Sequence, residues 1–462
     1  MGKHILVVGS GTFGVSTALS LRQRGHHVTI FERLPIPAED SSSNDVTKVI
    51  RPDYGDDSLY MGGKMYQALA VEAITRFRKL DLETTQRYGK KSYIECGVAF
   101  ATREKDMNPY ELMSYKALLR SNEYKDALEL LDAQSVERLL GKDFAGQFPH
   151  GYLNKKAGFA DSGLIIAHLN NLAKEAGIRY VVGKSEGLFT GYIVANNRVI
   201  GIKTGDGKSH FGDAVLMAAG SWTPSLVPEL KGLCEPTAQP VIHFSTSDPR
   251  YKSGRFPVWF GDMSQTGYYG FPLTTKNELK FAHHGAGYTS SFHIKTAPST
   301  SPKTPCATAV VTSPNIPREA LLKYRSFLQT FFPALNELDV ARTRLCWYCD
   351  AWDGNFYIDA VPGRHGLFVA TGGSGHAFKF TPVIGEVVAD VIEEKPNEYR
   401  DLFKWRVPTK EQRDTVESQK MEYERGAKCL ENMVMADLED LKASTFKSGK
   451  LAAKPREGKG KL

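Results

Sequence analysis

The sequence predicts an α/β fold of two domains (α+β), in which a nucleotide-binding domain is interleaved with a domain built on an antiparallel sheet. Residues 4–32 carry a strand, a glycine-rich turn, a helix and a second strand, in the order of a dinucleotide-binding unit. Residues 240–340 carry short alternating stretches separated by turns, which are typical of an antiparallel sheet with one exposed face. The length of 462 residues also favours two domains, because chains beyond about 250–300 residues seldom form a single hydrophobic core.

Composition and charge exclude several classes of protein. Hydrophobic residues make up 41% and charged residues 24% of the chain, which is typical of a globular protein rather than a disordered one. The net charge of +7 comes mostly from residues 442–462, and no basic stripe interleaved with aromatic residues runs through the body of the chain. We therefore expect an anionic small ligand and a solvated tail, with no nucleic-acid partner.

Cysteine use and hydropathy indicate an intracellular protein without a membrane span. No apolar run reaches the roughly 18 residues that a membrane-spanning helix needs, and the strand expected at residue 4 leaves no room for a signal peptide. The last residues, Gly460-Lys461-Leu462, are close to the peroxisomal address Ser-Lys-Leu, and a frayed basic end is the alternative. The cysteines are scattered, unlike those of a disulfide framework: Cys96, Cys234, Cys306, Cys346, Cys349 and Cys429.

The dinucleotide-binding unit begins the chain. His4–Val8 is an apolar run typical of a buried parallel strand, Val15–Arg24 has helical spacing, and Val28–Phe31 is a second strand. The glycines between them let backbone N–H groups approach a pyrophosphate, and Glu32 would accept hydrogen bonds from ribose hydroxyls. The pattern indicates a dinucleotide but does not choose between NAD and FAD. The cofactor-binding residues expected here are Gly9, Gly11, Thr12, Phe13, Gly14, Glu32 and Arg33.

A polar loop, residues 41–51, follows the second strand too closely to be a linker between domains. It carries two cations, Lys48 and Arg51, together with Thr47. These cations could reach the cofactor or a substrate carboxylate, and arginine suits two parallel hydrogen bonds to a carboxylate. A solvated loop is the alternative.

The remaining helices are predicted from apolar spacings of three and four residues. Residues 64–140 should be mostly helical, with strand-like pieces near Ser92–Phe100, and Asp161 or Ser162 can cap the helix that follows. A charged helix is expected over Lys410–Ala443, ahead of a Lys/Gly-rich end that is expected to be disordered. The other predicted helices are Met65–Leu80, Pro109–Leu119, Leu164–Ala176, Arg318–Phe331 and Phe380–Glu394.

Strands are predicted where β-branched and aromatic residues cluster between turns. A hairpin is expected over Gly191–Lys203 through Asn196-Asn197, and a loop over Pro298–Pro317. The other predicted strands are Arg179–Val182, Ala214–Trp222, Val258–Phe260, Gly267–Phe271, Glu278–Ala282, Phe356–Asp359 and Leu367–Ala370.

Two motifs follow in the last third of the chain. Cys346-Trp-Tyr-Cys349 stands before a predicted strand, and Gly373-Ser-Gly-His-Ala-Phe-Lys379 leads from a strand into a helix. The first could be a redox or zinc pair, but a second pair is missing, so no metal is expected. A thioredoxin-like pair should open a helix just after a strand, and this context lacks that arrangement. At the start of the helix, the charge of Lys379 and the helix dipole would act together on an anion.

Over roughly residues 4–400 the sequence resembles the monomeric sarcosine oxidase and amadoriase family of FAD amine oxidases. The resemblance implies FAD, a glutathione-reductase-like FAD-binding Rossmann domain, and oxidation of secondary amines with release of hydrogen peroxide. The motifs that carry it occur in the family's order and spacing: GSGTFG with Glu32, Thr47-Lys48 with Arg51, Gly158-Phe-Ala-Asp161, Tyr269-Gly-Phe-Pro272, Leu279-Lys280, Cys346-Trp-Tyr348 and Gly373 to Lys379.

We accordingly expect a discontinuous FAD-binding domain over residues 1–85, 150–240 and 341–400. The substrate domain, with its antiparallel sheet, is expected over residues 86–149 and 241–340. Residues 401–462 are expected to form a charged C-terminal tail.

The resemblance also implies cofactor contacts. Cys346 is similar to the cysteine that is joined covalently to the flavin 8α-methyl group, which would leave Cys349 a bystander. Lys280 is similar to the lysine near flavin N5 that promotes the reaction with oxygen. Further cofactor contacts are expected from Thr47, Lys48, Gly373, Gly375, Phe378 and Lys379.

On the substrate side, Arg51 and Lys379 resemble the cations that bind the substrate carboxylate. Tyr269 and Tyr348 would line the pocket. His284 matches a histidine of the sarcosine-oxidase-type members, as a base or a steric gate.

The expected substrate is a secondary amine derived from an amino acid, such as sarcosine, L-pipecolate or L-saccharopine, with O2 as electron acceptor and the protein acting as a monomer. Amadoriases tend to carry an acid near His284, and Phe281-Ala-His-His284-Gly has none, which argues against fructosyl amines. Lys48 and the Cys-Trp-Tyr-Cys sequence nevertheless look closer to the fungal amadoriase and saccharopine oxidase branch. The alternatives are a fructosyl amino acid oxidase, a tailoring oxidase of secondary metabolism, a nicotinamide-dependent dehydrogenase and a non-catalytic flavin-binding module.

Overall fold

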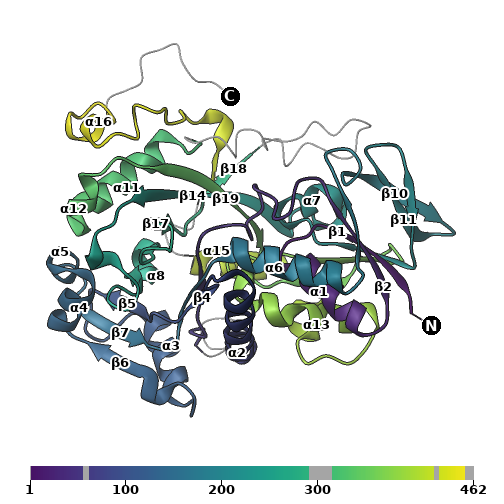
Figure 1. Ribbon diagram of the computed structural model, residues 1–462, viewed down its shortest axis with the longest axis horizontal. Coiled ribbons are helices and arrows are strands. Elements are labelled where there is room, and N and C mark those ends of the chain that lie inside the picture. The colour runs from purple at the N-terminus through teal and green to yellow at the C-terminus, as the bar shows by residue number, and fades with distance from the viewer. Residues whose placement is uncertain (1, 56–61, 291–314, 421–425, 453–462) are drawn as a thin grey trace.

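Figure 1 shows the computed structural model of the chain, which describes residues 2–55, 62–290, 315–420 and 426–452. Two sheets lie on opposite sides of the view, with the long helix α2 (Gly63–Tyr88) between them. Within the described residues, no helix combines the length and the apolar character needed to cross a membrane.

A mainly parallel sheet forms the nucleotide-binding part, with strand order β20-β21-β13-β1-β2-β9. Side chains alternate along a strand, so Ile5 and Val7 pack with helices α1 (Thr12–Gln23) and α6 (Ser162–Glu175). Leu6 and Val8 pack on the other face with a small sheet of β10 (Phe189–Ala195), β11 (Arg198–Thr204) and β12 (Ser209–Phe211). Burial on both faces explains the unbroken apolar run at the N-terminus. The strands are β1 (His4–Val8), β2 (His27–Glu32), β9 (Arg179–Val182), β13 (Ala214–Met217), β20 (Tyr357–Ala360) and β21 (Leu367–Thr371).

Helices α1 (Thr12–Gln23) and α13 (Thr381–Ile392) cross at very close range on this sheet. A Cβ atom added to Gly385 would lie 2.1 Å from the backbone oxygen of Ser16, and one added to Gly14 would lie 2.0 Å from the backbone oxygen of Gly9. The hydroxyl of Ser16 donates to the Thr381 carbonyl at 2.6 Å and accepts from the Gly385 N–H at 2.9 Å. Glycine at both positions therefore sets how closely α1 approaches β1 and α13.

The second sheet has strand order β22-β18-β14-β17-β16-β15-β5-β7-β6, and β19 also pairs with β14. Most neighbours are antiparallel, as predicted, but β15 with β5 and β18 with β22 are parallel. Helix α11 (Arg318–Phe331) packs on it through Leu321 and Leu328. The strands are β5 (Val98–Thr102), β6 (Leu128–Leu131), β7 (His150–Asn154), β14 (Cys234–Ser245), β15 (Val258–Gly261), β16 (Tyr268–Gly270), β17 (Glu278–His283), β18 (Tyr288–Thr289), β19 (Arg342–Ala351) and β22 (Lys428–Cys429).

Strands β14 and β19 were not predicted, and they are the longest pair in this sheet. Pro236 and Pro240 interrupt the strand pattern of β14, and β19 is buried on both faces and so does not alternate. The expectation that Cys346 stands before a strand was therefore wrong, since it lies within β19. Both strands reach two cores: Trp347 packs in the core of the second sheet, whereas Cys349 packs against the parallel sheet.

Several predicted elements coincide with those observed. Helices α3 (Pro109–Leu119) and α11 and strand β9 have the predicted bounds. Helix α6 (Ser162–Glu175) is capped by Asp161, whose carboxylate accepts from the N–H of Leu164 at 3.0 Å. The hairpin of β10 (Phe189–Ala195) and β11 (Arg198–Thr204), which is followed by β12 (Ser209–Phe211), turns through Asn196 and Asn197, both with positive φ.

Other parts of the first half differ from the prediction. The polar loop ends in β3 (Lys48–Ile50), which pairs with β8 (Gly158–Ala160), and β8 also pairs with β4 (Tyr93–Ile94). Strand β6 interrupts the region predicted to be mostly helical, between α3 and α4 (Ala133–Leu140). The strand predicted over Ala214–Trp222 ends at Met217 and continues into a 3₁₀ turn.

The C-terminal region is more tightly packed than expected. The helix predicted over Lys410–Ala443 is limited to α15 (Lys410–Gln419), and β22 and α16 (Ala443–Lys447) follow. Leu430 and Leu441 are buried in the core of the second sheet, and Arg318 on α11 forms an ion pair with Asp440 at 3.0 Å. The loop prediction falls largely on residues 291–314, and the basic end on residues 453–462; both lie outside the described residues. The domain boundaries stay predictions.

Candidate functional site

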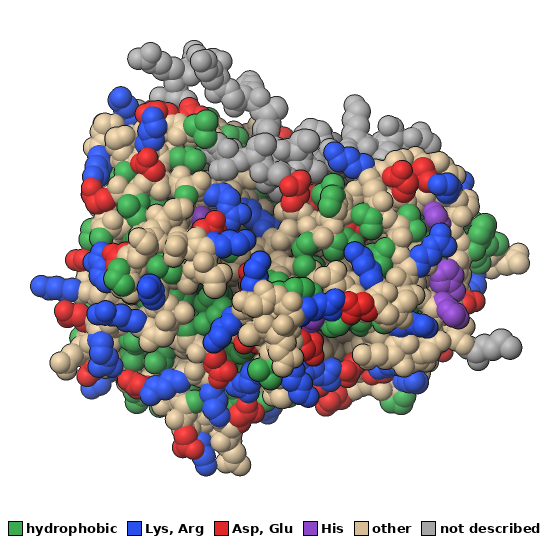
Figure 2. Space-filling model, in the orientation of Figure 1, with side chains coloured by type: hydrophobic (Ala, Val, Ile, Leu, Met, Phe, Trp, Pro, Cys, Tyr) green, Lys and Arg blue, Asp and Glu red, His purple; other side chains and the backbone are tan. Residues whose placement is uncertain are grey.

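A cavity of about 1660 Å³ lies between the two sheets. On the face in Figure 2, Lys and Arg side chains gather near the central hollow. All but two of the predicted site residues line the cavity, the exceptions being Gly14 and Thr47. Those that line it are Gly9, Gly11, Thr12, Phe13, Glu32, Arg33, Lys48, Arg51, Tyr269, Lys280, His284, Cys346, Tyr348, Gly373, Gly375, Phe378 and Lys379.

The nucleotide end of the cavity is formed where β1 and β2 end. The N–H of Gly9 donates to the Phe31 carbonyl at 2.9 Å, and Gly9 has a φ of 105°, which favours glycine. Glu32 accepts from the backbone N–H of Ser10 at 3.2 Å and from its hydroxyl at 3.0 Å, while burial raises the pKa of Glu32. Arg33 pairs with Asp40 and lies 4.9 Å from the ring of Trp222.

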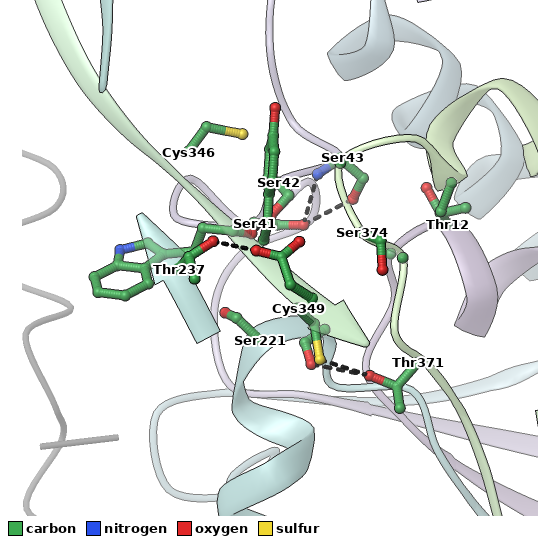
Figure 3. Close-up of a pocket in the computed structure, with 18 of the residues that line it drawn as sticks. Thr12, Ser41, Ser42, Ser43, Ser221, Thr237, Cys346, Cys349, Thr371 and Ser374 are labelled. Carbon is green, nitrogen blue, oxygen red and sulfur yellow. Dashed lines mark hydrogen bonds between the residues drawn. The ribbon is translucent and has the colours of Figure 1, made fainter. Parts of the chain in front are cut away.

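Hydroxyl groups are concentrated along the wall of the cavity, as Figure 3 shows. Ser41 and Ser43 are joined by a hydrogen bond of 2.7 Å between their hydroxyls. The buried hydroxyls of Thr47 and Ser221 have no hydrogen-bond partner among the described residues. Because buried polar groups are normally paired, the Ser221 hydroxyl, which lies in the cavity lining, is suited to a bound polar ligand, whereas Thr47 lies outside that lining. The cavity volume, the glycine turn and the free Ser221 hydroxyl together fit a dinucleotide.

Cys346 and Cys349 point away from each other. Figure 3 shows their thiols on opposite sides of β19, as side chains three residues apart on a strand must be. Both cysteines are buried. The hydroxyl of Thr371 donates to the Cys349 sulfur at 3.3 Å, and a hydrogen bond with Cys234 lowers the pKa of Cys349. The geometry does not suit a disulfide between Cys346 and Cys349.

Lys280 on β17 belongs to a buried ionic cluster that the sequence did not reveal. Its ammonium donates to the Asp45 carboxylate at 2.5 Å and to the Thr47 carbonyl at 3.1 Å, and Lys48 donates to the same carboxylate oxygen at 2.6 Å. Burial lowers the pKa of Lys280 to about 8, although Asp45 opposes that shift. Burial opposes ionisation of Asp45, but Lys280, Lys48 and Arg344 outweigh it and hold its pKa well below the ordinary value.

Arg51, which is half-buried, and Lys379, which is buried, are two cations at one end of the cavity. Arg51 donates to the Tyr110 hydroxyl at 2.9 Å and to the Asp53 carbonyl. Lys379 donates to the Tyr54 hydroxyl at 2.8 Å. Burial and the charge of Arg51 lower the pKa of Lys379 well below its ordinary value.

Asp53 is the carboxylate that acts on both cations, and its oxygens are engaged elsewhere. The Asp53 carboxylate accepts from Tyr152 at 2.9 Å and from Asn154 at 3.1 Å. Burial disfavours the charge on Arg51, but Tyr110 and Asp53 outweigh it, so the pKa of Arg51 is above its ordinary value. An anionic ligand is the natural counter-charge for this end of the cavity.

Tyr269, Tyr348 and His284 come together near the middle of the cavity. Tyr269 and Tyr348 share a hydrogen bond, and the rings of His284 and Tyr348 lie 6.1 Å apart. Burial raises the pKa of both tyrosines, so both hydroxyls stay protonated near neutral pH.

Other cavity residues were missed from sequence: Tyr54, Tyr110, Thr237, Asp350, Val416, Glu417 and Gln419 of α15, and Lys420 just after it. Asp45, which holds Lys280, was missed as well. They belong to no motif, and the sequence carried no pattern that would have found them. Within the described parts of the chain, His, Cys, Asp and Glu side chains form no group of three or more that could hold a metal ion.

Comparisons with known proteins agree with this geometry. L-saccharopine oxidase of Schizosaccharomyces pombe is 29% identical over 434 residues, covering 88% of this chain and 94% of that protein. N-methyl-L-tryptophan oxidase of Salmonella typhi is 27% identical over 393 residues, covering 84% of this chain and 94% of that protein.

Solved structures share the fold. Fructosyl peptide oxidase from E. terrenum superposes with a TM-score of 0.78 at 21% identity, covering 95% of this chain and 99% of that one. Amadoriase I from Aspergillus fumigatus gives a TM-score of 0.73 at 24% identity, covering 94% of this chain and 96% of that one. The model of the family described as FAD dependent oxidoreductase matches residues 4–391. Since that match covers most of the chain, this protein belongs to the FAD-dependent oxidoreductase family.

Proposed function

We propose that the protein is an FAD-dependent oxidase of secondary amines derived from amino acids, such as sarcosine, L-pipecolate or L-saccharopine. The observation that carries the proposal is the pair of cations, Arg51 and Lys379, in the same cavity as the glycine-rich turn. Such a pair suits the carboxylate of an amino acid derivative. The names of the relatives, L-saccharopine oxidase and N-methyl-L-tryptophan oxidase, support an N-substituted amino acid as substrate.

FAD would be held by the turn from Gly9 to Gly14, by Glu32, and by the unpaired hydroxyl of Ser221. Bound FAD would supply the electron acceptor for oxidation of the C–N bond: the carbon would lose a hydrogen with two electrons, the nitrogen would lose a proton, and O2 would take up two electrons and two protons to give hydrogen peroxide. Water then hydrolyses the released imine.

The protein's own residues position the amine. Arg51 and Lys379 bind the carboxylate, and Tyr269, Tyr348 and His284 surround the nitrogen and its substituent. The amine must react in its neutral form to give up electrons from the adjacent C–H bond, so the rate should rise with pH. A rate that stays flat from about pH 6 to about pH 10 would contradict this part of the proposal.

Lys280 would act in the second half of the reaction. A fixed positive charge in a buried site stabilises the negative charge that develops as oxygen is reduced. Asp45 holds this lysine in place at 2.5 Å, and the Thr47 carbonyl at 3.1 Å fixes its direction.

The test is to mix the purified protein anaerobically with sarcosine, pipecolate, saccharopine and fructosyl-valine in turn and to follow the flavin absorbance. Rapid bleaching by one of the first three supports the proposal. Rapid bleaching by fructosyl-valine alone would identify a fructosyl amino acid oxidase instead. Bleaching by none of them would contradict the proposal for these substrates and favour an unusual amine or a non-catalytic flavin protein.

Covalent attachment of FAD through Cys346 is a separate proposal, supported by its thiol being buried in the cavity wall while that of Cys349 bonds to Thr371. The yellow colour of the wild-type protein should stay with the polypeptide after acid precipitation. Cys346→Ser should release the flavin, and Cys349→Ser should retain it. Loss of colour in the second variant alone would assign the attachment to Cys349.

A further inference from the structure

Asp350 is an acid of the cavity that is explained neither by a dinucleotide nor by the carboxylate clamp, the pair of cations Arg51 and Lys379. Asp350, on β19 two residues beyond Tyr348, lines the cavity and accepts a hydrogen bond from the Thr237 hydroxyl. Among the described residues it forms no salt bridge, unlike Asp45, which pairs with two lysines. A half-buried carboxylate with a single hydroxyl partner can accept further hydrogen bonds from a ligand.

The groups around Asp350 come from three elements. Glu235 lies opposite it on β14 in the strand register. His284 lies beyond the end of β17, and Lys420 lies at the C-terminal end of α15, where it pairs with Glu417 at 2.8 Å. Burial raises the pKa of Asp350 to about 6, with Glu235 acting in the same direction and Thr237, His284 and Lys420 opposing. Asp350 is therefore charged at neutral pH.

Asp350 lies at the substrate side of the cavity. His284 is close enough to exert an electrostatic effect on Asp350 and also on His376, whose carbonyl accepts from Lys379 at 3.0 Å. A ligand that reaches from the clamp past His284 and Tyr348 would meet Asp350. The negative charge is unsuited to the phosphates of a dinucleotide, which it would repel.

We propose that Asp350 is a specificity-determining residue, which accepts a hydrogen bond from an ammonium or hydroxyl group on the nitrogen substituent of the amine. This inference rests on the proposed amine oxidase function and deepens it. The site would then favour secondary amines whose substituent carries a hydrogen-bond donor over amines whose substituent is a simple alkyl group.

The experiment compares the holoenzyme and its Asp350 variants on sarcosine, whose methyl substituent has no donor, on saccharopine, which adds an ammonium, and on fructosyl-valine, which adds hydroxyls. The wild type should prefer a donor-bearing amine. In Asp350→Asn, kcat/KM for an ammonium-bearing substrate should fall about 10- to 100-fold, because a hydrogen bond to a charged group is lost. Sarcosine should change by less than about 3-fold, well below the loss of one charged hydrogen bond.

Two further variants separate the ligand chemistries and control for the substitution. An asparagine still accepts hydrogen bonds from a hydroxyl, so Asp350→Asn should spare fructosyl-valine, whereas Asp350→Leu should impair both donor-bearing amines. Asp248, a surface acid that pairs with Arg250 at 2.6 Å, provides the matched control Asp248→Asn, which should behave as the wild type on all substrates.

The pH profile gives an independent readout. The KM for saccharopine should rise as pH falls through about 6, where Asp350 takes up a proton, and the KM for sarcosine should not follow it. Thr237→Val removes a hydroxyl that lowers the pKa of Asp350, so the rise should begin at higher pH. In Asp350→Asn this difference between the two substrates should vanish, even though His284 is still present.

Four results would overturn the proposal. An equal loss on every amine, together with a weakened or altered flavin, would mean that Asp350 serves the cofactor. Unchanged activity of Asp350→Leu on saccharopine and fructosyl-valine would mean that the carboxylate does not touch the substituent. A wild type that bleaches with sarcosine or pipecolate but with neither donor-bearing amine would refute the inference and leave the oxidase function intact, whereas bleaching by no amine at all contradicts both.

Discussion

Asp45 shows how one side chain can hold several others in this site. Its carboxylate is fully buried and accepts from Lys280 at 2.5 Å and from Lys48 at 2.6 Å, while an Arg344 nitrogen lies 4.0 Å away. A buried ion pair contributes little compared with an apolar pair, but removing one partner leaves the other charge uncompensated. Asp45 is therefore expected to matter for stability as well as for the position of Lys280.

Asp45→Asn should lower the free energy of unfolding by about 3–5 kcal/mol, because it leaves Lys280 buried without a counter-charge. Chemical denaturation of the holoenzyme measures this change. Lys48→Met, which leaves the Asp45–Lys280 pair intact, should cost much less. The pKa of Asp45 is lowered in the folded protein, so the stability that its charge contributes is present above its ordinary pKa and is lost as pH falls through its lowered pKa. The free energies of unfolding of the wild type and of Asp45→Asn should therefore approach each other in acid. A variant as stable as the wild type at neutral pH would contradict this account.

Lys280 should control the reaction with oxygen in a pH-dependent way. Its pKa of about 8 means that it is cationic below that pH and neutral above it. The rate constant for reoxidation of the reduced enzyme by O2, measured by stopped flow, should therefore fall as pH rises through about 8.

Lys280→Met should be slower by about 10²- to 10³-fold and should lose the pH dependence, as expected when a preorganised charge is removed. Lys276→Met, at an exposed lysine on the turn before β17, is the control and should reoxidise normally. Reoxidation of Lys280→Met at the wild-type rate would exclude this role.

The site residues that could be predicted from sequence are those that belong to a motif. The glycine turn, Glu32, Arg51, Lys280 and Lys379 all fall in the cavity. The sequence carries no acid beside His284, but Asp350 comes to it from another strand, and His284 opposes the rise in the pKa of Asp350. Tertiary neighbours of this kind leave no trace in local spacing.

At the scale of elements, the glycine at position 385 determines how closely α1 packs against α13. Gly385→Ala would place a methyl group 2.1 Å from the Ser16 carbonyl oxygen, so the helices must separate. Overpacking of this kind should cost about 1–3 kcal/mol and lower the thermal unfolding midpoint. Gly191→Ala on β10, where an added Cβ atom meets no atom within 4 Å, should leave the midpoint unchanged. Equal midpoints for the two variants would show that α1 and α13 can separate without cost.

Element boundaries were predictable where the hydrophobic periodicity and the residues that begin or end an element agree, as for α3, α11 and β9. They failed for β14 and β19 because two prolines and an unbroken buried run remove the alternation that identifies a strand. Pairing of these strands is a long-range property, since β14 and β19 are separated by about a hundred residues of sequence.

At the scale of the whole molecule, the C-terminal segment packs into the fold and is not a free tail. Leu430 and Leu441 are buried in the core of the second sheet, whereas Leu438 between them is 70% exposed. Truncation to alanine at either buried position should cost about 2–5 kcal/mol, and Leu438→Ala should be nearly neutral, as measured by chemical denaturation. Three equally stable variants would mean that the segment contributes nothing to the core. The two-domain α/β architecture was predicted and is observed, but the charge-rich composition of this segment concealed its few core residues.

Strands β14 and β19 pass through both cores, and this has a mechanical consequence. A hinge between two domains requires a flexible crossing point, but here two long paired strands cross from one core to the other. We therefore expect the two parts to rotate little against each other during turnover. Amine and product would enter and leave by small movements at the rim of the cavity, and a flavin fixed to Cys346 would keep the same orientation to both halves throughout the catalytic cycle.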